Sequence, residues 1–448
     1  MGKKPDSEER GVLTFDSIYR QKLTKKQEAV AMVPKKGNLA FGLGPSNPPA
    51  LLAALADRVA AGDVEELHLY YQLASEGARP LFRTDFLDRL HFHCNFMTGL
   101  DRELIKEAGS SAAIDFMSCY LWQLPRVLTE FHHINVFMIT VSPMDRHGYF
   151  SLGTSCDYSA TVARGCDILI VEVNENMPRV FGDNLIHVSE VDAVVENHVP
   201  LVELQDRPLS QEDEIIGTKI AEMVPDGACL QFGIGGIPNA VAKSLSNHKE
   251  LGVHTEMLTN CIVDLYDVGA VTNKKKNIHR YKTVFTLCFG NRRLYDFIDD
   301  NPAVESYPSW HINDPAVIEQ NDNVISVNSI IEIDLLGQVN AESIAGNEFS
   351  GVGGQRDFMS GAFRSKGGMS FLAFYSTARE GKISKIVPSL SGIVSDSRME
   401  PMYMVTEHGM TNLKGKTNSQ RSLALIELAA PQFREELLRS AKEMGLVR

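Results

Sequence analysis

The feature that most constrains this chain is a segment that occurs twice. The stretch FGLG at 41–44 matches FGIG at 232–235, and proline and an alanine-rich helical pattern follow in both copies. Further on, LHLY at 67–70 occupies the place of VHTE at 253–256. The copies lie roughly 190 residues apart, which indicates a duplicated structural unit. The repeat therefore predicts two related domains, rather than the roughly three that a length of 448 residues suggests.

Around the two copies, short β-branched runs alternate with helical patterns. Strand character is clearest at 136–141, 168–173 and 324–333, and 385–394 looks like a further strand that Pro388 interrupts. Alternation of this kind is typical of a mainly parallel sheet covered by helices. We therefore expect an α/β fold with mainly parallel, open sheets.

The domain boundary is expected at a polar, proline-containing stretch at 204–212. This places one open α/β/α domain at 1–204 and a second, related domain at 213–448. Because only the second copy carries a carboxylate in its second apolar segment, we expect that domain to supply the chemistry and the first to shape the site.

Composition and charge restrict the kinds of binding partner and the cellular compartment that are expected. A net charge of −13 argues against a nucleic-acid surface, although it allows an anionic small ligand. The seven scattered cysteines indicate reduced core residues in a cytoplasmic protein. No apolar run is long enough to span a membrane, and the N-terminal MGKKPDSEER lacks the apolar segment of a secretory signal.

The second copy combines a glycine corner with an acid. Gly233, Gly235 and Gly236 follow an apolar run and precede a helical pattern, and such a corner points free N–H groups at an anion. Glu256 follows in the next apolar segment, where the first copy has Tyr70. Glu256 can be a nucleophile or base beside a bound anion, or a strand-end carboxylate paired with a basic side chain.

Three other patterns have both a functional and a structural interpretation. His91–Cys94 suggests a metal site, but because no second cluster stands at ligand spacing we favour period-2 strand packing and expect no metal. Lys274–Lys276 favours a solvated turn over a phosphate contact. The glycine-dense loop at 350–358 exposes backbone N–H groups, and its Arg356 and Asp357 are candidates for a mutual ion pair.

Four motifs then occur in one order: FGIGGIPNAV at 232–241, HTEML at 254–258, GVGGQRDF at 351–358 and TEHGMTNLKG at 406–415. A single glycine corner is weak evidence because many α/β proteins have one. Together, however, the motifs resemble the acetyl-CoA hydrolase/transferase family of class I CoA-transferases, and look most like its 4-hydroxybutyrate and butyrate:acetate CoA-transferase members. The resemblance extends over nearly the whole chain.

The resemblance implies roles for individual residues. Glu256 matches the family's nucleophile, which forms a glutamyl-CoA thioester, and Asn313 matches an asparagine that helps to hold the acyl carbonyl. Gly354 matches an oxyanion-hole N–H, and Glu407 matches a second active-site glutamate beside the CoA thiol end. The implied CoA contacts are Gly233, Ile234, Gly235, Gly236, Ile237, Ile331, Gly354 and Arg379.

Two positions depart from the family pattern. Ser350 replaces an asparagine that is common before the second glycine loop, and Arg379 stands where some relatives have lysine. Both side chains still allow a polar contact.

The implied reaction moves CoA between two short-chain carboxylic acids, such as 4-hydroxybutyrate or butyrate and acetate, by covalent, ping-pong catalysis. Acyl-CoA is then a substrate, no cofactor is bound permanently, and a homodimer is expected. Because glutamate is ordinarily ionised at neutral pH, Glu256 is expected to attack without prior deprotonation.

Three other functions compete with this one. An acyl-CoA hydrolase would use the same thioester with water as acceptor. A nicotinamide-dependent oxidoreductase is disfavoured because Pro238 occupies the place of the third fingerprint glycine. A CoA-sensing module would leave Glu256 unexplained.

Overall fold

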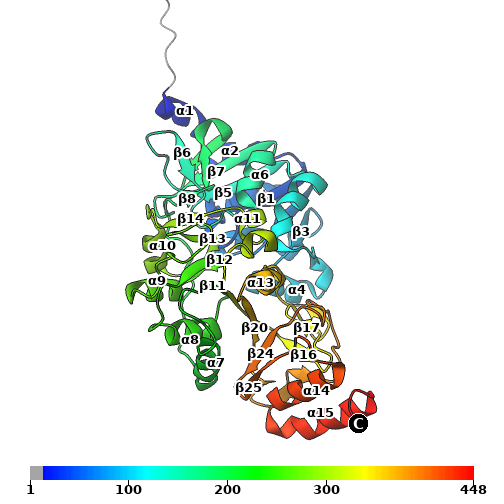
Figure 1. Ribbon diagram of the computed structural model, residues 1–448. Helices are drawn as coiled ribbons and strands as arrows, with labels where there is room; N and C mark the ends of the chain where they lie inside the picture. Colours follow the sequence, from blue (N-terminus) through cyan, green and yellow to red (C-terminus); the bar gives the residue numbers. More distant parts are fainter. Residues whose placement is uncertain (1–13) are drawn as a thin grey trace, which may run out of the picture.

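Two large sheets organise the chain, which the computed structural model describes for residues 14–448 (Figure 1). The N-terminal decapeptide on which the expectation of no secretory signal rests lies outside the described residues. In the part of the chain that is described, no helix combines the length and apolarity needed to cross a bilayer.

The first sheet has seven strands in the order β10-β7-β5-β1-β2-β3-β4. Its strands are β1 (Lys36–Phe41), β2 (Glu66–Tyr71), β3 (Leu90–Cys94), β4 (Ile114–Phe116), β5 (Val136–Val141), β7 (Ile168–Val173) and β10 (Ala193–Glu196). All six residues of β5 are buried, as expected for a parallel strand that is covered on both faces.

The second sheet has nine strands in the order β25-β24-β20-β15-β11-β12-β13-β14-β8. Its strands are β8 (Phe181–Gly182), β11 (Cys229–Phe232), β12 (Gly252–Leu258), β13 (Thr283–Cys288), β14 (Val304–Ser306), β15 (Val324–Ser329), β20 (Met369–Ala373), β24 (Tyr403–Thr406) and β25 (Gly409–Asn412). Only the β24–β25 pair in this sheet is antiparallel.

The two sheets have the same strand order over their parallel parts. The strands correspond one to one across the two sheets. The order β10, β7, β5, β1, β2, β3, β4 in the first sheet matches the order β24, β20, β15, β11, β12, β13, β14 in the second. The predicted α/β fold with two related, mainly parallel sheets is therefore confirmed. The boundary between 204 and 213 stays a prediction, and β8 from the first half pairs with β14 of the second sheet.

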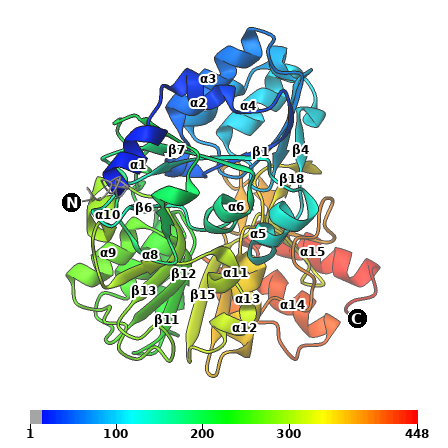
Figure 2. The same cartoon turned by 90° about the horizontal axis from the view of Figure 1, so that it is seen from above.

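Helices cover the sheets from both sides. Those of the first half are α1 (Phe15–Lys22), α2 (Lys26–Ala31), α3 (Pro49–Ala60), α4 (Gly99–Ala108), α5 (Leu124–Arg126) and α6 (Ser159–Gly165). Seen from above, α2, α3 and α4 lie on one side of the first sheet and α5 and α6 on the other (Figure 2).

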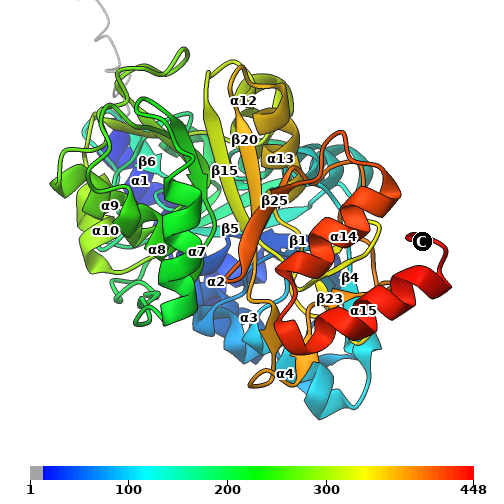
Figure 3. The ribbon, with the colours of Figure 1, turned by 60° about the horizontal axis from the view of Figure 1, so that its bottom comes forward.

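The helices of the second half are α7 (Gln211–Ala221), α8 (Gly236–Ser244), α9 (Asn260–Asp267), α10 (Arg292–Ile298), α11 (Ser309–Ile312), α12 (Pro315–Ile318), α13 (Gln355–Arg364), α14 (Asn418–Leu428) and α15 (Pro431–Glu443). Helices α7 and α8 flank the second sheet on one side and α12 and α13 on the other (Figure 3). A capping box starts α7, because the Ser210 side chain accepts from the Asp213 N–H and the Asp213 carboxylate accepts from the Ser210 N–H.

Short strands outside the two sheets pair locally. Strand β6 (Tyr149–Ser151) pairs with β9 (Leu185–His187), β18 (Ser343–Ile344) with β19 (Asn347–Glu348), and β21 (Thr377–Ala378) with β22 (Ile383–Ser384). Strand β16 (Glu332–Asp334) lies between β17 (Val339–Asn340) and β23 (Ile386–Val387).

Some local predictions were wrong. The strand expected over 324–333 ends at Ser329, and a new strand starts at Glu332. The strand expected over 385–394 is reduced to β23, because Pro388 follows it directly and offers no N–H for a ladder. Lys276 is not in a solvated turn: it is buried, and its ammonium donates to the Val253 and Lys282 carbonyls at 2.8 and 2.7 Å.

Candidate active site

The site lies where the second sheet changes the direction of its strand order. Strand β11 pairs with β12 on one side and with β15 on the other. In open parallel sheets, ligands bind outside the carboxyl ends of strands at such a switch point. Gly233, the first residue after β11, donates its N–H to the Val327 carbonyl of β15 at 3.2 Å, so the glycine corner starts at this crevice.

A cavity of about 220 Å³ occupies this position and is lined by both halves of the chain. Drug-sized ligands usually occupy pockets of about 300–1,000 Å³, so this cavity suits the reacting end of a larger molecule. Among its lining residues are Gln72, Leu73, Phe96, Leu121, Phe232, Gly233, Ile234, Glu256, Met257, Leu287, Ser329, Gly353, Gly354 and Gln355.

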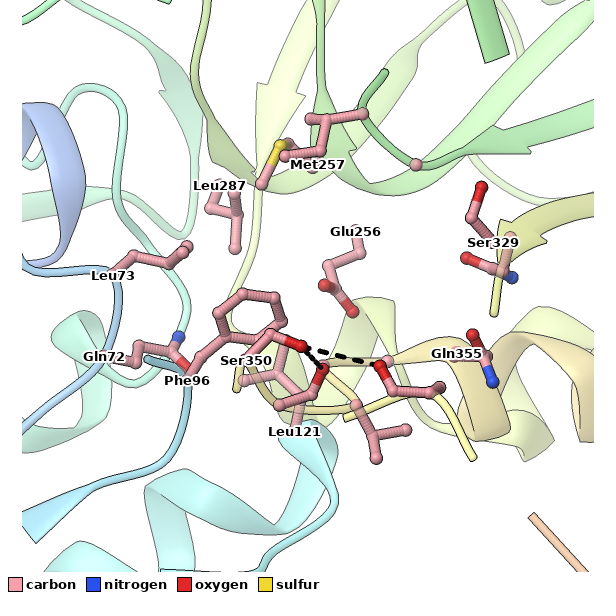
Figure 4. A pocket seen from close by; sticks show the side chains of 18 of the residues that line it. Gln72, Leu73, Phe96, Leu121, Glu256, Met257, Leu287, Ser329, Ser350 and Gln355 are labelled. Carbon is pink, nitrogen blue, oxygen red and sulfur yellow. Dashed lines mark hydrogen bonds between the residues drawn. The ribbon is translucent and has the colours of Figure 1, made fainter. Parts of the chain in front are cut away.

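Glu256 lies between two chemically different sides of this cavity. It comes from β12 and is half-buried. In Figure 4, Leu73, Phe96 and Leu287 lie to one side of the carboxylate, and Ser329 and Gln355 lie to the other. One side is thus mainly apolar and the other polar.

Two donors hold the Glu256 carboxylate. The Asn313 amide donates from Nδ2 to Glu256 Oε2 at 2.7 Å, and the Gly354 backbone N–H beside the carboxylate also lowers its pKa. Gly354 is the N-cap of α13, so the carboxylate lies at the positive end of that helix. A Cβ at position 354 would overlap both Glu256 Oε2 and Asn313 Nδ2. Glycine is therefore required for this close approach.

Burial nevertheless raises the pKa of Glu256 to about 7. The hydrogen bonds from Asn313 and Gly354 act in the opposite direction, and the negative charge of Asp157 raises the pKa further. At pH 7 roughly half of the carboxyl groups are then protonated. The expectation that Glu256 is ionised at neutral pH assumed the pKa of a solvated glutamate. With the raised pKa, only about half of the Glu256 side chains are ionised at pH 7.

Asp357 is part of this cluster, whereas the sequence suggested only an ion pair with Arg356. It is fully buried, and its Oδ2 lies 3.5 Å from Asn313 Nδ2. Burial, followed by the charge of Glu256, raises its pKa well above the usual value. The suggested Arg356–Asp357 pair is wrong, because Arg356 instead donates to Glu400 at 2.7 Å.

The glycine corner adds an anion-binding geometry. Gly235 has φ +117°, which favours glycine, and α8 begins at the next residue. A Cβ at Gly236 would overlap the Arg207 guanidinium and the Asp213 carboxylate. Arg207 donates to Asp213 at 3.2 Å and to the Tyr375 hydroxyl at 2.6 Å. The Arg207 guanidinium thus stands at the N-terminus of α8, where it is paired with the buried Asp213 carboxylate, and the free N–H groups of the helix start favour an anion.

The predicted CoA contacts of this corner occupy three different places. Gly233 and Ile234 line the Glu256 cavity. Gly235 lines a neighbouring pocket together with Ile234 and Arg207. Gly236 and Ile237 are buried in the first turn of α8.

Three predicted residues lie apart from the Glu256 cavity. Ile331 follows β15, Arg379 is exposed in the β21–β22 turn, and Glu407 lies in the β24–β25 turn. None of the three lines the cavity around Glu256. The Glu407 carboxylate accepts from the Ser376 N–H at 3.0 Å, and His408 Nε2 is 3.5 Å from it. Ile331 and Glu407 follow the parallel strands β15 and β24, so they share the carboxyl edge of the second sheet with the glycine corner, whereas Arg379 lies in a separate antiparallel hairpin.

Gln72 is a further cavity residue that sequence analysis missed. It directly follows β2, is 2% exposed, and its Nε2 has no hydrogen-bond partner within residues 14–448. The repeat gives a partial signal: β2 corresponds to β12, so the end of β2 is expected at the equivalent edge of the first sheet, but the repeat does not indicate that this edge faces the Glu256 cavity.

The site thus combines a half-buried carboxylate, a side-chain amide and a backbone N–H beside it, and a glycine corner at a helix N-terminus. The sequence matches the acetyl-CoA hydrolase/transferase N-terminal domain over residues 5–203 and the C-terminal domain of the same family over residues 290–441.

Individual relatives cover nearly the whole chain. The 4-hydroxybutyrate coenzyme A transferase of Clostridium kluyveri is 39% identical over 96% of this chain and 100% of its own. The butyryl-CoA:acetate CoA-transferase of Anaerostipes caccae is 38% identical over 97% of this chain and 99% of its own. The crystal structure of RipA from Yersinia pestis superposes with a TM-score of 0.92 at 44% identity, over 97% of this chain and 100% of RipA. The chain belongs to the acetyl-CoA hydrolase/transferase family.

Proposed function

We propose that this chain transfers CoA from an acyl-CoA to a short-chain carboxylate, such as acetate, butyrate or 4-hydroxybutyrate, with Glu256 as the nucleophile. The class of the enzyme, a CoA-transferase, follows from relatives of that activity at 35–39% identity over nearly the full chain. The observation that carries the proposed mechanism is the single carboxylate of Glu256, held by Asn313 and the N-cap of α13 inside a small cavity.

The covalent sequence begins with the ionised form of Glu256. Its oxygen attacks the thioester carbonyl, the C–S bond breaks, and CoA leaves as a thiolate, which yields an acyl-glutamyl anhydride. The thiolate then attacks Cδ of Glu256 and expels the first acid as its carboxylate, which leaves a glutamyl-CoA thioester. The second carboxylate reverses both steps, so no proton is gained or lost over the cycle, and the kinetics are ping-pong.

The raised pKa of Glu256 suits this chemistry. A carboxylate that is less stabilised by solvent is more basic, and therefore a better nucleophile toward a thioester. Each addition places negative charge on an oxygen, and the Gly354 N–H already points at the carboxylate whose carbon is attacked. We assign Gly354 to the oxyanion and Asn313 to orienting Glu256 and holding the acyl carbonyl. One such backbone donor typically contributes about 10²–10³-fold in rate.

The remainder of CoA is proposed to bind along the carboxyl edge of the second sheet. Gly233–Ile237 would approach the pantetheine and Arg207 a phosphate at the start of α8. Ile331 and Glu407 would contact CoA farther along the same edge, and Arg379 would contact it from the β21–β22 hairpin. Binding energy from these remote contacts can be used at the thioester.

The alternative acceptor is water, which would make the protein a hydrolase. The apolar side of the cavity, with Leu73, Phe96 and Leu287, favours transfer because it offers few partners for an attacking water. The ratio of labelled acetate incorporated into acyl-CoA to free acid released distinguishes the two activities.

We also propose that the protein is cytoplasmic and forms a homo-oligomer, the predicted dimer. Seven free cysteines, five of them buried, support a reducing compartment. Exposed Phe131 and Trp310 line one apolar groove that a second copy can cover.

Substitution of the nucleophile tests the proposal. Glu256→Gln keeps the size of the side chain and removes the attacking oxygen, so exchange of labelled acetate into acyl-CoA should disappear while calorimetry still shows CoA binding. Glu319→Gln is the matched control, because Glu319 pairs with Arg364 outside the cavity and should exchange normally. Exchange that survives in Glu256→Gln would refute the role of Glu256.

A further inference from the structure

The edge of the first sheet carries an unusual polar face. Strands β2, β3 and β4 are parallel and adjacent, and such strands are normally apolar on both faces. Their inward residues, among them Leu67 and Phe92, pack into the core as expected. The opposite face instead presents three imidazoles and two carboxylates: Glu66, His68, His91, His93 and Asp115. All of these except Glu66 line a cavity of about 650 Å³.

The favoured interpretation of His91–Cys94 as a period-2 strand is confirmed, because Phe92 and Cys94 are buried while the two histidines face outward. That alternation also aligns His91 with a second histidine. His91 is the register partner of His68 on β2, and their rings stack with centroids 4.8 Å apart. The cluster is thus formed by neighbouring strands and was not visible as a ligand spacing in one segment.

Three ligand atoms converge at one edge of the stacked rings. Glu66 Oε1 lies 3.9 Å from His68 Nε2 and 3.8 Å from His91 Nε2, and all three atoms are within 4.8 Å of one another. Two ligands on a tetrahedral ion with bonds of about 2.0–2.1 Å are about 3.3 Å apart. Rotations of these partly exposed side chains can close the difference.

The hydrogen bonds behind His68 leave its outer nitrogen free to bind. His93 Nδ1 lies 3.5 Å from Asp115 Oδ2, and a nearby carboxylate favours the tautomer with the proton on Nδ1. His93 Nε2 then accepts from His68 Nδ1–H at 2.9 Å. In this arrangement His68 Nε2 carries a lone pair that faces the Glu66 carboxylate. The His68 Nε2 lone pair and the Glu66 carboxylate are both acceptors, and a cation placed between them would bind to both.

We infer that Glu66, His68 and His91 form a binding site for a borderline divalent transition-metal ion such as Zn²⁺, Co²⁺ or Ni²⁺. Two imidazoles and one carboxylate suit these ions rather than Mg²⁺ or Ca²⁺, which prefer all-oxygen ligands. The hydrogen bond between His68 Nδ1 and His93 Nε2 is the kind of outer contact that metal-binding histidines usually have, and the Asp115 carboxylate lies beside His93. The exposed carboxylate of Glu66 leaves an entry path from solvent.

The site is separate from the acyl-transfer centre, since no residue of the triad lines the Glu256 cavity. The ion would join β2 to β3, next to the edge strand β4. Its binding is therefore expected to stabilise the fold rather than to take part in the reaction. This proposed metal site departs from the expectation in the sequence analysis that the chain binds no metal.

Titration of tag-free, chelator-treated protein with Zn²⁺ tests the inference. One saturable equivalent per chain is expected by calorimetry, with a rise in Tm because the ion binds the folded state. Co²⁺ in its place should give visible d–d bands that Zn²⁺ displaces. His68→Gln and His91→Gln should each weaken binding at least about 10-fold, and His93→Gln should weaken it by about 10–100-fold through the lost outer hydrogen bond.

His133→Gln is the matched control, because His133 is also an exposed histidine beside a carboxylate, Asp167 at 3.2 Å. Its Zn²⁺ affinity should equal that of the unsubstituted chain. Glu66→Gln, which keeps the side-chain shape, covers the case in which a histidine variant does not fold. Absence of saturable binding, or unchanged affinity in the three triad variants, would overturn the inference.

Discussion

Removal of the Asn313 amide should shift the pH dependence of the reaction. Asn313 donates to Glu256 Oε2 at 2.7 Å, and this hydrogen bond lowers a pKa that burial has raised to about 7. In Asn313→Ala the carboxylate loses this donor but stays buried. Its pKa should therefore rise further above 7, and the ionised, attacking form should appear only at higher pH.

The size of the shift follows from the strength of the lost bond. A hydrogen bond to a charged group contributes about 1.5–3 kcal/mol, and one pKa unit corresponds to about 1.36 kcal/mol, so a rise of roughly 1–2 units is expected. At pH 7 the ionised fraction would fall from about one half to about one tenth or one hundredth. Through this shift, kcat/KM for acyl-CoA should fall by roughly 5- to 50-fold at pH 7, and a large part of that loss should be recovered at pH 9. The loss of the amide contact to the acyl carbonyl should lower kcat/KM by a further factor that is the same at every pH.

The assay is the pH profile of kcat/KM for exchange between acyl-CoA and labelled acetate. Asn328→Ala is the control, because Asn328 is a buried amide in the same cavity that hydrogen-bonds to Gln231 and Ser326 rather than to Glu256. The control should leave the acidic limb of the profile in place. An acidic limb that does not move in Asn313→Ala, or activity that fails to recover with rising pH, would refute the reasoning.

Three further predictions concern neighbouring groups. Gly354→Ala should lower kcat by at least about 10²-fold, because its Cβ would displace the Glu256 carboxylate and the oxyanion donor; single-turnover rates check this, and near-normal rates would contradict it. Arg207→Met should raise the KM for acyl-CoA by about 10–100-fold with little change in kcat, which a Michaelis analysis at two salt concentrations measures; an unchanged KM would exclude Arg207 from CoA binding. In urea unfolding at pH 8, Glu256→Gln should be more stable than the unsubstituted chain by up to about 3 kcal/mol. The reason is that the pKa of Glu256 in the folded state, about 7, lies above the ordinary 4.5, so the charged carboxylate destabilises the native state. This gain should disappear as the pH falls from about 7 to below 4.5, and a gain that does not depend on pH would contradict the prediction.

The fold was predictable because the repeat and the strand–helix alternation are local patterns. Each copy contains an apolar strand, a glycine corner and a helix, and these features recur in β1, β2, β11 and β12. Strand ends were less predictable. The break at Ile330–Ile331 lies inside a segment rich in valine and isoleucine, and it is imposed by the tertiary pairing of β16 with β17 and β23.

The centre of the site was also predictable, but its surroundings were not. Glu256, Asn313 and Gly354 were expected from their motifs, and the structure brings all three together. Gln72 comes from the other sheet, and its role depends on which strand ends face each other. Arg207 lies in the predicted linker, where a single arginine carries no pattern.

The pKa of Glu256 could not be read from the residue type, because it is set by burial in the folded chain. The same holds for Asp357, whose acidic side chain faces Asn313 rather than its neighbour Arg356. Both depend on packing between segments that are far apart in sequence.

Chemical capture of the covalent intermediate tests the central claim most directly. The protein is incubated with acyl-CoA in the absence of an acceptor acid and treated with borohydride, which reduces a thioester but leaves a free carboxylate unchanged. Peptide mapping by mass spectrometry should then find acyl-CoA-dependent inactivation and a reduced side chain at Glu256, and free CoA or acetate alone should give neither. Inactivation that maps to another residue, or protein that stays active and unmodified while exchange proceeds, would contradict the account.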